Sequence, residues 1–246
     1  MANWNDPRPT GLGFGASPSL DGVAGRAGYD AGLRKYMLSI YNYMASGVLL
    51  TGVVALLMAR SGMAAAMLGS PIKWLFMLSP LAIVFAMSFG RDRFSTATLQ
   101  LMFWAFAALM GVSMSTIFLV YTGQSIATTF FATAAAFAGL SLVGYTTKKD
   151  LTGMGSFLTM GVIGILVAMV INMFLQSSVL QLVVSILGVL IFAGLTAYDT
   201  QRLKRDYEYI AGSDMVGKVV ILGALSLYLD FINMFQFLLS FMGQRD

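Results

Sequence analysis

Two carboxylates stand inside long apolar stretches near the end of the chain. Asp199 lies in "FAGLTAYDTQRLK" and Asp230 in "ALSLYLDFINMFQFLL". An acid at the centre of a membrane helix costs roughly 2.5 kcal/mol or more, so such residues mark functional sites by default. These two aspartates are therefore the first candidates for chemistry.

The spacing of the two aspartates suggests that they meet. Their midpoint in the chain falls between Asp214 and Met215, just after the turn-like "IAGSD". If the helix with Asp199 continues through "QRLKRDYEYI" and turns there, the two acids lie at the same height on adjacent antiparallel helices. Counting from the far end of each helix puts Asp230 nearer the outside, so tilt or an uneven turn has to absorb the difference.

A facing pair of acids has a definite chemistry. Two like charges in a dry site cannot both ionise easily, so Asp199 and Asp230 are expected to share one proton near neutral pH and to lose it as the pH rises. Deprotonated carboxylate oxygens are hard ligands that suit Ca²⁺. Two carboxylates are an incomplete site, so we expect calcium binding at these residues to be weak and assisted by water.

An arginine near the pair would favour its ionised form. Arg91 and Arg93 lie at the end of the apolar run 74–89, at about the right level. Each is also readily explained as a topology anchor at a membrane surface. Both interpretations stay open at this point.

The helix of Asp230 also carries a polar stripe. Ser226, Asp230, Asn233 and Gln236 follow one another at intervals of four, three and three residues, which places them on one helix face. Lipid cannot satisfy polar groups, so this face is expected to look inward. The alternative is a stripe that only joins helices through hydrogen bonds.

Composition places the chain in a membrane. Its 246 residues are 58% hydrophobic and 11% charged, against about 25% charged in soluble domains. The net charge of +4 comes from loop Lys and Arg residues, so it predicts no nucleic-acid partner. Cysteine and histidine are absent, which excludes disulfides, thiol chemistry, Ser-His catalysis and zinc sites of the usual kind. No cofactor is expected beyond calcium as a permeant or weakly bound ion.

Apolar runs of about 20 residues predict an all-α membrane protein with seven transmembrane helices. The expected spans are 36–59, 74–89, 97–121, 125–145, 155–175, 179–198 and 219–242. Residues 1–33 are rich in Gly, Pro, Asn and Asp and are predicted to form a disordered cytoplasmic tail. The transmembrane domain is expected to cover residues 34–246.

Charge asymmetry predicts the orientation. Lys and Arg residues gather before span one, after spans two and four, and between spans six and seven, whereas the opposite loops hold only Arg60 and Lys73. The positive-inside rule then puts the N-terminus in the cytoplasm and the C-terminus outside.

The two aspartate motifs resemble the signature of the Bax inhibitor-one family, and "TTKKDLTGMGSFLTMGVIG" resembles the segment that enters its fifth span. The resemblance covers about residues 30–243. It implies six helices wrapped around a central seventh and a pH-sensitive calcium leak. It also implies that Asp199 and Asp230 form a pair that latches a pore through a shared proton.

The same resemblance implies that an arginine after span two exchanges partners with the pair. By alignment this is Arg93, with Arg91 as the alternative. The chain has "GRDR" at this place, so Asp92 interrupts what would be a denser basic cluster in the family.

A bacterial inner membrane is the expected location of the protein.

Two other functions remain. An intramembrane aspartyl protease would use Tyr198-Asp199, but its second motif, Gly-x-Gly-Asp, is replaced by "LYLD", and no proline follows Pro80. The other alternative is a non-transporting modulator of a membrane quality-control protease or of a stress or cell-death pathway. The sequence favours a leak and predicts no enzymatic activity.

Overall fold

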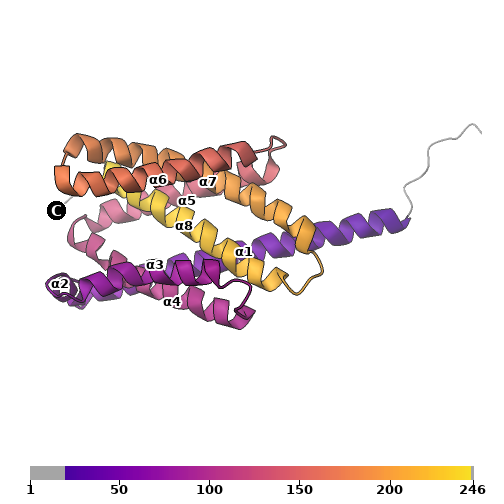
Figure 1. Ribbon diagram of the computed structural model, residues 1–246, viewed down its shortest axis with the longest axis horizontal. Helices are drawn as coiled ribbons and strands as arrows, with labels where there is room; N and C mark the ends of the chain where they lie inside the picture. Colours follow the sequence, from indigo (N-terminus) through magenta and orange to yellow (C-terminus); the bar gives the residue numbers. More distant parts are fainter. Residues whose placement is uncertain (1–19, 245–246) are drawn as a thin grey trace, which may run out of the picture.

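The computed structural model describes the backbone of residues 20–244 and the side chains from residue 28 onward. This part of the chain is helical, without a strand. The elements are α1 (Leu20–Arg60), α2 (Met63–Leu68), α3 (Lys73–Phe89), α4 (Thr96–Met114), the short 3₁₀ helix η1 (Ser115–Leu119), α5 (Gly123–Thr146), α6 (Thr152–Leu175), α7 (Ser178–Ile210) and α8 (Val216–Met242) (Figure 1). The all-α prediction is confirmed.

Six helices in the described residues are long and apolar enough to cross a membrane. They are α1 from Gly28 onward, α4 continued by η1, α5, α6, α7 and α8. The chain is therefore an integral membrane protein. The remaining predicted span, 74–89, coincides with α3, an apolar helix of 17 residues that falls short of this length.

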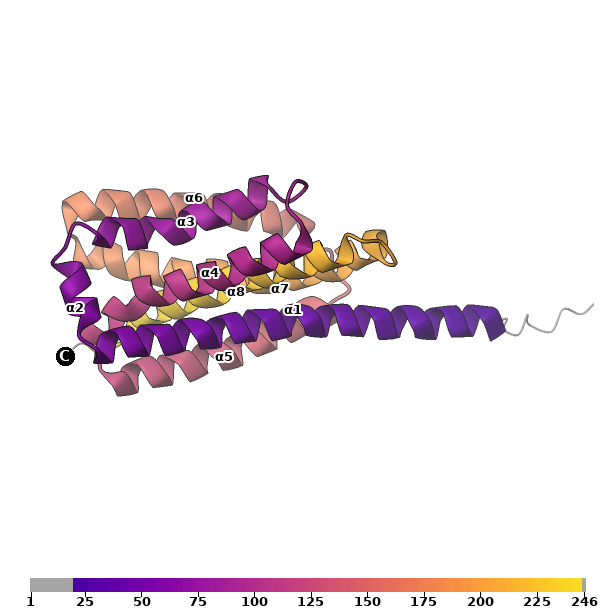
Figure 2. The same cartoon turned by 90° about the horizontal axis from the view of Figure 1, so that it is seen from below.

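The first helix begins earlier than the sequence indicates. α1 starts at Leu20, so residues 20–33 are helical where a disordered tail was expected; residues 1–19 lie outside the described part. α1 extends well past the ends of the other helices (Figure 2). Once a packed helix exists, each further residue gains a hydrogen bond without a new nucleation step, which explains how a Gly-rich stretch continues it.

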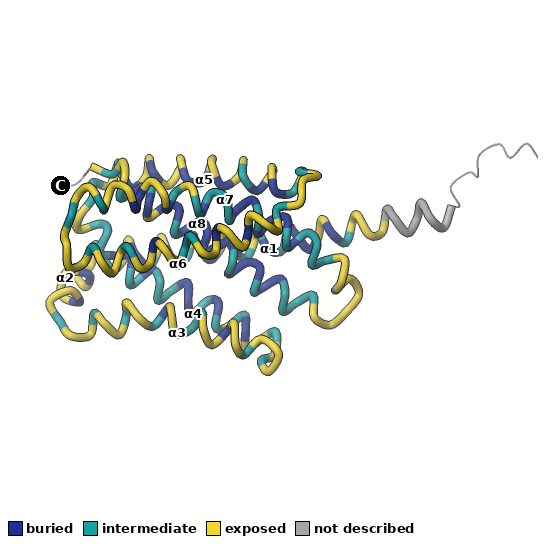
Figure 3. Tube along the Cα trace, turned by 45° about the horizontal axis from the view of Figure 1, so that its top comes forward, coloured by how far each residue is buried: buried dark blue, intermediate teal, exposed yellow. Residues whose placement is uncertain are grey.

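α8 is the most buried of the candidate spans. In its most apolar window 67% of the residues are buried, against 11–33% in the other five. α8 packs against α7, α1, α5 and α4, and Figure 3 shows buried residues gathered along it. The hydroxyl of fully buried Tyr228 lies 2.6 Å from that of Thr51, which satisfies both groups inside the bundle.

The turn between α7 and α8 falls in the segment that the sequence suggested, although its centre lies slightly earlier than the expected midpoint. α7 continues through Asp199 as far as Ile210, Gly212 adopts φ +78°, and α8 begins at Val216. Positive φ is a conformation that glycine adopts without steric penalty, so Gly212 suits a tight helical hairpin. This hairpin sets the register between the two aspartates.

Candidate functional site

Asp199 and Asp230 lie on the facing helices α7 and α8, in the interior of the bundle. Their exposed fractions are 5% and 4%. The Asp230 carboxyl is close enough to Asp199 and to Arg202 to interact with both electrostatically. The structure thus brings together the two acids that the sequence singled out.

Asp199 is fully engaged by its neighbours. The Ser226 hydroxyl donates to its Oδ2 atom, and a guanidinium nitrogen of Arg202 lies 3.2 Å from its Oδ1 atom. A second guanidinium nitrogen donates to the Ser226 oxygen at 3.1 Å. The three side chains form a closed triangle that compensates the charge of a buried carboxylate, which a lone acid at this depth could not achieve.

Asp230 is the less satisfied acid. Its Oδ2 atom is buried and has no hydrogen-bond partner among the described residues. Leaving a buried acceptor unpaired costs about 1–3 kcal/mol, and more for a charged group. The two acids are therefore unequal: Asp199 has an arginine and a hydroxyl as partners, whereas one oxygen of Asp230 has none among the described residues.

The register differs from the expected one by a helical turn. Asp199 meets Ser226, so Asp230 lies one turn farther along α8. The reason is the position of the turn, which occupies 211–215 and centres on Ser213 instead of the 214–215 midpoint. The two carboxyls are neighbours on a diagonal and do not face each other at equal height.

The arginine beside the acids is one that the sequence analysis assigned only to membrane topology. Arg202 follows Asp199 by three residues on the same helix, a spacing that brings side chains together. Its guanidinium also lies 5.7 Å from the centroid of the Tyr198 ring. The i, i+3 spacing in the sequence could have indicated this ion pair. Several other Lys and Arg residues lie in the same stretch, so Arg202 did not stand out.

Arg91 and Arg93, the two arginines that the sequence offered as partners of the acids, lie in different surroundings. Arg91 lines a cavity of about 440 Å³ together with Arg202, Asp206 and Lys218, and its Nε atom lies 3.5 Å from Asp92. Arg93 is exposed and is absent from this cavity. The described contacts of the two buried acids include neither of these arginines. Arg91 and Arg202 nevertheless line the same cavity.

The polar stripe is inward-facing only in part. Asn233 is half-buried and donates to the Leu229 carbonyl of its own helix at 2.8 Å. Gln236 is exposed, so the expectation that the whole stripe faces inward is wrong at this residue. With 3.6 residues per turn, Gln236 lies roughly 120° around the helix from Asp230, which takes it out of the interior.

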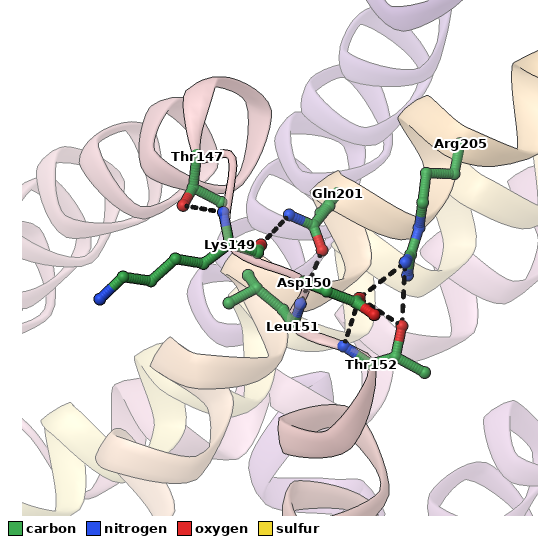
Figure 4. Close-up of polar contacts among 7 residues, drawn as sticks. All are labelled: Thr147, Lys149, Asp150, Leu151, Thr152, Gln201 and Arg205. Atoms are coloured by element: carbon green, nitrogen blue, oxygen red, sulfur yellow. Dashed lines mark hydrogen bonds and ion pairs between the residues drawn. The ribbon is translucent and has the colours of Figure 1, made fainter.

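A network of hydrogen bonds fixes α7 just beyond Asp199. The Gln201 side chain donates to the Lys149 carbonyl at 2.8 Å and accepts from the Leu151 amide at 2.9 Å (Figure 4). Gln201 is buried, so both halves of its amide are used where water is scarce. The connection between α5 and α6 is thereby tied to the helix that carries Asp199.

A second tie lies one turn along the same helix. Arg205 donates to Asp150 at 2.8 Å and to the Thr152 hydroxyl at 2.9 Å (Figure 4). Hydrogen bonds from the Thr152 side chain and amide, and then the Arg205 guanidinium, hold the pKa of the Asp150 carboxyl below its ordinary value. Asp150, Thr152 and Arg205 are called the loop clamp below.

The acids do not form a complete metal site. Among the described side chains, residues 28–244, no group of three or more acidic side chains is arranged to hold a metal ion. Asp199 and Asp230 alone would leave most of the six to eight positions around Ca²⁺ to water and carbonyl oxygens.

Comparison with known proteins places the chain in a family. Residues 33–246 match the family model described as "Inhibitor of apoptosis-promoting Bax1". An uncharacterized protein of Rickettsia prowazekii is 46% identical over 228 residues, which cover 88% of this chain and 92% of that protein. The inner membrane protein YbhL of Escherichia coli is 44% identical over 219 residues, covering 87% of this chain and 94% of that protein. The match includes both buried aspartates and the helices that carry them, and the chain belongs to the Bax inhibitor-one family.

Proposed function

We propose that the protein is a pH-sensitive calcium leak of the bacterial inner membrane, gated by Asp199 and Asp230. The observation that carries the proposal is the unequal pair itself. Two buried acids lie within electrostatic reach of each other. Asp199 is held by Arg202 and Ser226, whereas one oxygen of Asp230 has no hydrogen-bond partner among the described residues. Intramembrane acids in such surroundings are typical of ion and proton pathways.

The gate works through one proton. With a proton on the pair, the carboxyls can remain close together in a dry interior. Removing it leaves two negative charges and one arginine, and the repulsion favours separation of α7 and α8 at this level. Arg202 is the group that can respond, because its side chain is 39% exposed and borders the 440 Å³ cavity that also contains Asp206 and Arg91.

The cavity supplies the approach to the gate. Its other lining residues come from the ends of α7 and α8, so it opens at the hairpin end of the bundle. A hydrated cation entering here would meet Asp206 first and then the acids behind Arg202. Calcium fits this path because carboxylate oxygens and retained water are its preferred ligands, and a two-carboxylate site would release it readily.

We further infer seven spans, with α3 as the short seventh and α8 as the central helix. The burial of α8 supports the second point. The positive-inside rule then puts the N-terminus and the α7–α8 hairpin in the cytoplasm and the C-terminus outside. The name of the E. coli relative supports an inner-membrane location.

The test is calcium flux in vesicles that contain only lipid and the purified full chain. We expect flux above that of protein-free vesicles, changing between about pH 6 and 8, the range in which a coupled acid pair titrates. Absence of flux at every pH in this range would contradict the leak.

A non-transporting modulator of a membrane protease or stress pathway is the second candidate. The observation that favours it is α6, of which only 11% of the apolar window is buried, so the helix offers a broad face to another membrane protein. A modulator would show no flux in pure vesicles and would act only when its partner is added.

A further inference from the structure

An open groove of about 880 Å³ runs along the membrane-spanning part between α1 and α5. Its volume lies within the roughly 300–1,000 Å³ typical of ligand pockets. α8 lines the bottom of the groove through Phe231. Its lining includes Asp30, Arg34 and Val48 on α1, Ala138 and Ser141 on α5, and Phe231 on α8.

The groove continues into a second, smaller cavity. This one measures about 290 Å³ and shares Val48, Phe130 and Phe231 with the first. Together they follow α1 from Arg34 to Leu56, roughly 33 Å of helix, which is close to the roughly 30 Å of a hydrocarbon core. An occupant must therefore be long, slender and mostly apolar.

One end of the groove carries two opposite charges. Asp30 and Arg34 are exposed, line the groove and are spaced four residues apart on one face of α1. Arg34 is the nearer of the two to the apolar part. The order along the groove is therefore carboxylate, guanidinium and then hydrocarbon lining, which complements an ammonium, a phosphate and an acyl chain in that order.

A buried hydroxyl in the wall lacks a partner. Ser141 is 6% exposed, and its Oγ atom has no hydrogen-bond partner among the described residues. Thr133 and Thr146 on the same helix instead donate to the carbonyl four residues back. An occupant with an ester oxygen would give the Ser141 hydroxyl an acceptor.

We propose that this groove binds one phospholipid with an amine-bearing headgroup, such as phosphatidylethanolamine. Arg34 binds the phosphate, Asp30 binds the ammonium, the Ser141 hydroxyl donates to an ester oxygen, and an acyl chain lies between α1 and α5 against Phe231. In a phosphatidylethanolamine headgroup the ammonium is farther from the acyl chains than the phosphate, which matches the order of the two charges.

The first test uses a phosphatidylethanolamine with a photoreactive acyl chain, mixed into vesicles with the full chain. Mass spectrometry of the cross-linked peptides should place the label mainly on 37–49 and 134–142, well above the label on lipid-facing α6. Ala138→Trp fills the groove and should lower this labelling several-fold. Ala136→Trp is the matched control, because Ala136 is exposed on α5 outside the groove. Equal labelling of groove and α6 peptides, or no effect of Ala138→Trp, would overturn the proposal.

The second test concerns the headgroup. Phosphatidylethanolamine and phosphatidylglycerol carrying the same photoreactive chain should compete unequally, with the former preferred. Asp30→Asn should abolish that preference, and Arg34→Gln should lower labelling by both lipids. Lys35→Gln, at an exposed neighbour outside the groove, should change neither. If the groove is labelled but Asp30→Asn and Arg34→Gln behave like Lys35→Gln, the headgroup is not recognised and the proposal is wrong.

Discussion

At the scale of single residues, the site depends on the different surroundings of Asp199 and Asp230 and on the position of Arg202. Asp199 receives the Ser226 hydroxyl and the guanidinium, whereas one oxygen of Asp230 lacks a partner in the described structure. Both acids could be found from sequence because a carboxylate in an apolar run is rare. Arg202 could not, because basic residues at the end of a span are usually explained by topology. The role of a charged side chain depends on its partner, and a single sequence does not show partners.

Replacing Arg202 should therefore have a larger effect than replacing either arginine after α3. Arg202→Gln removes the ion pair with Asp199 and leaves a buried carboxylate with only Ser226. We expect it to lower the free energy of unfolding by about 1–2 kcal/mol, a value reduced because the guanidinium is partly exposed to solvent. Denaturant unfolding in detergent measures this. Arg93→Gln is the control, since Arg93 is exposed, and equal effects of the two changes would contradict the assigned role.

At the scale of elements, the helices were easier to predict than their ends. The apolar runs marked all the long helices, and "IAGSD" marked the α7–α8 turn, because hydrophobic length and turn chemistry are local properties. The start of α1 at Leu20 and the one-turn shift between the acids were not accessible in this way. Both depend on how far a helix propagates and on how two helices pack, which are properties of the assembled bundle.

Close packing of α5 on α7 gives a prediction with a matched control. A methyl group at Gly144 would collide with the backbone of Ala197, whereas one at Gly139 would meet nothing within 4 Å. Gly144→Ala should destabilise the protein by about 1–3 kcal/mol through overpacking. Gly139→Ala should be neutral or stabilising by up to about 1 kcal/mol, because alanine favours the helix. The free energies of unfolding of the two variants and the wild type measure this difference, and equal values for the two variants would contradict the prediction.

The loop clamp should weaken in acid. The folded-state pKa of Asp150 is lowered, so its stabilising contribution is complete above the ordinary carboxyl pKa of about 3.9 and is lost as the pH falls through the lowered value. Amide exchange in 147–152, corrected for intrinsic rates, should show protection at pH 5–7 and its loss below about pH 4.

Asp150→Asn gives the complementary result for the clamp. This variant should lose much of the protection in 147–152 already at pH 7, because the amide cannot form the ion pair with Arg205. Asp214→Asn, a change of the same kind at an exposed turn residue, should leave it intact. A clamp that behaves identically in both variants would show that Gln201 alone holds the loop.

At the scale of the whole molecule, α3 decides the topology. The chain contains no cysteine, so single cysteines report their side of the membrane without background. If α3 crosses, cysteines replacing Ser70 and Asp92 should react with an impermeant reagent from opposite sides, with position 92 facing the cytoplasm. Labelling of both from one side would leave six spans and put the two chain ends on the same side.

In the proposed mechanism, one proton on the buried pair of aspartates controls the calcium flux. The most direct measurement is calcium flux in pure proteoliposomes across about pH 6–8 for the wild type, Asp199→Asn, Asp230→Asn and the exposed control Asp214→Asn. Asn has nearly the shape of Asp but cannot titrate, so Asp199→Asn and Asp230→Asn should each flatten the pH response, while Asp214→Asn should reproduce the wild-type profile. A wild-type pH profile in either Asp199→Asn or Asp230→Asn would show that the buried pair does not control the flux.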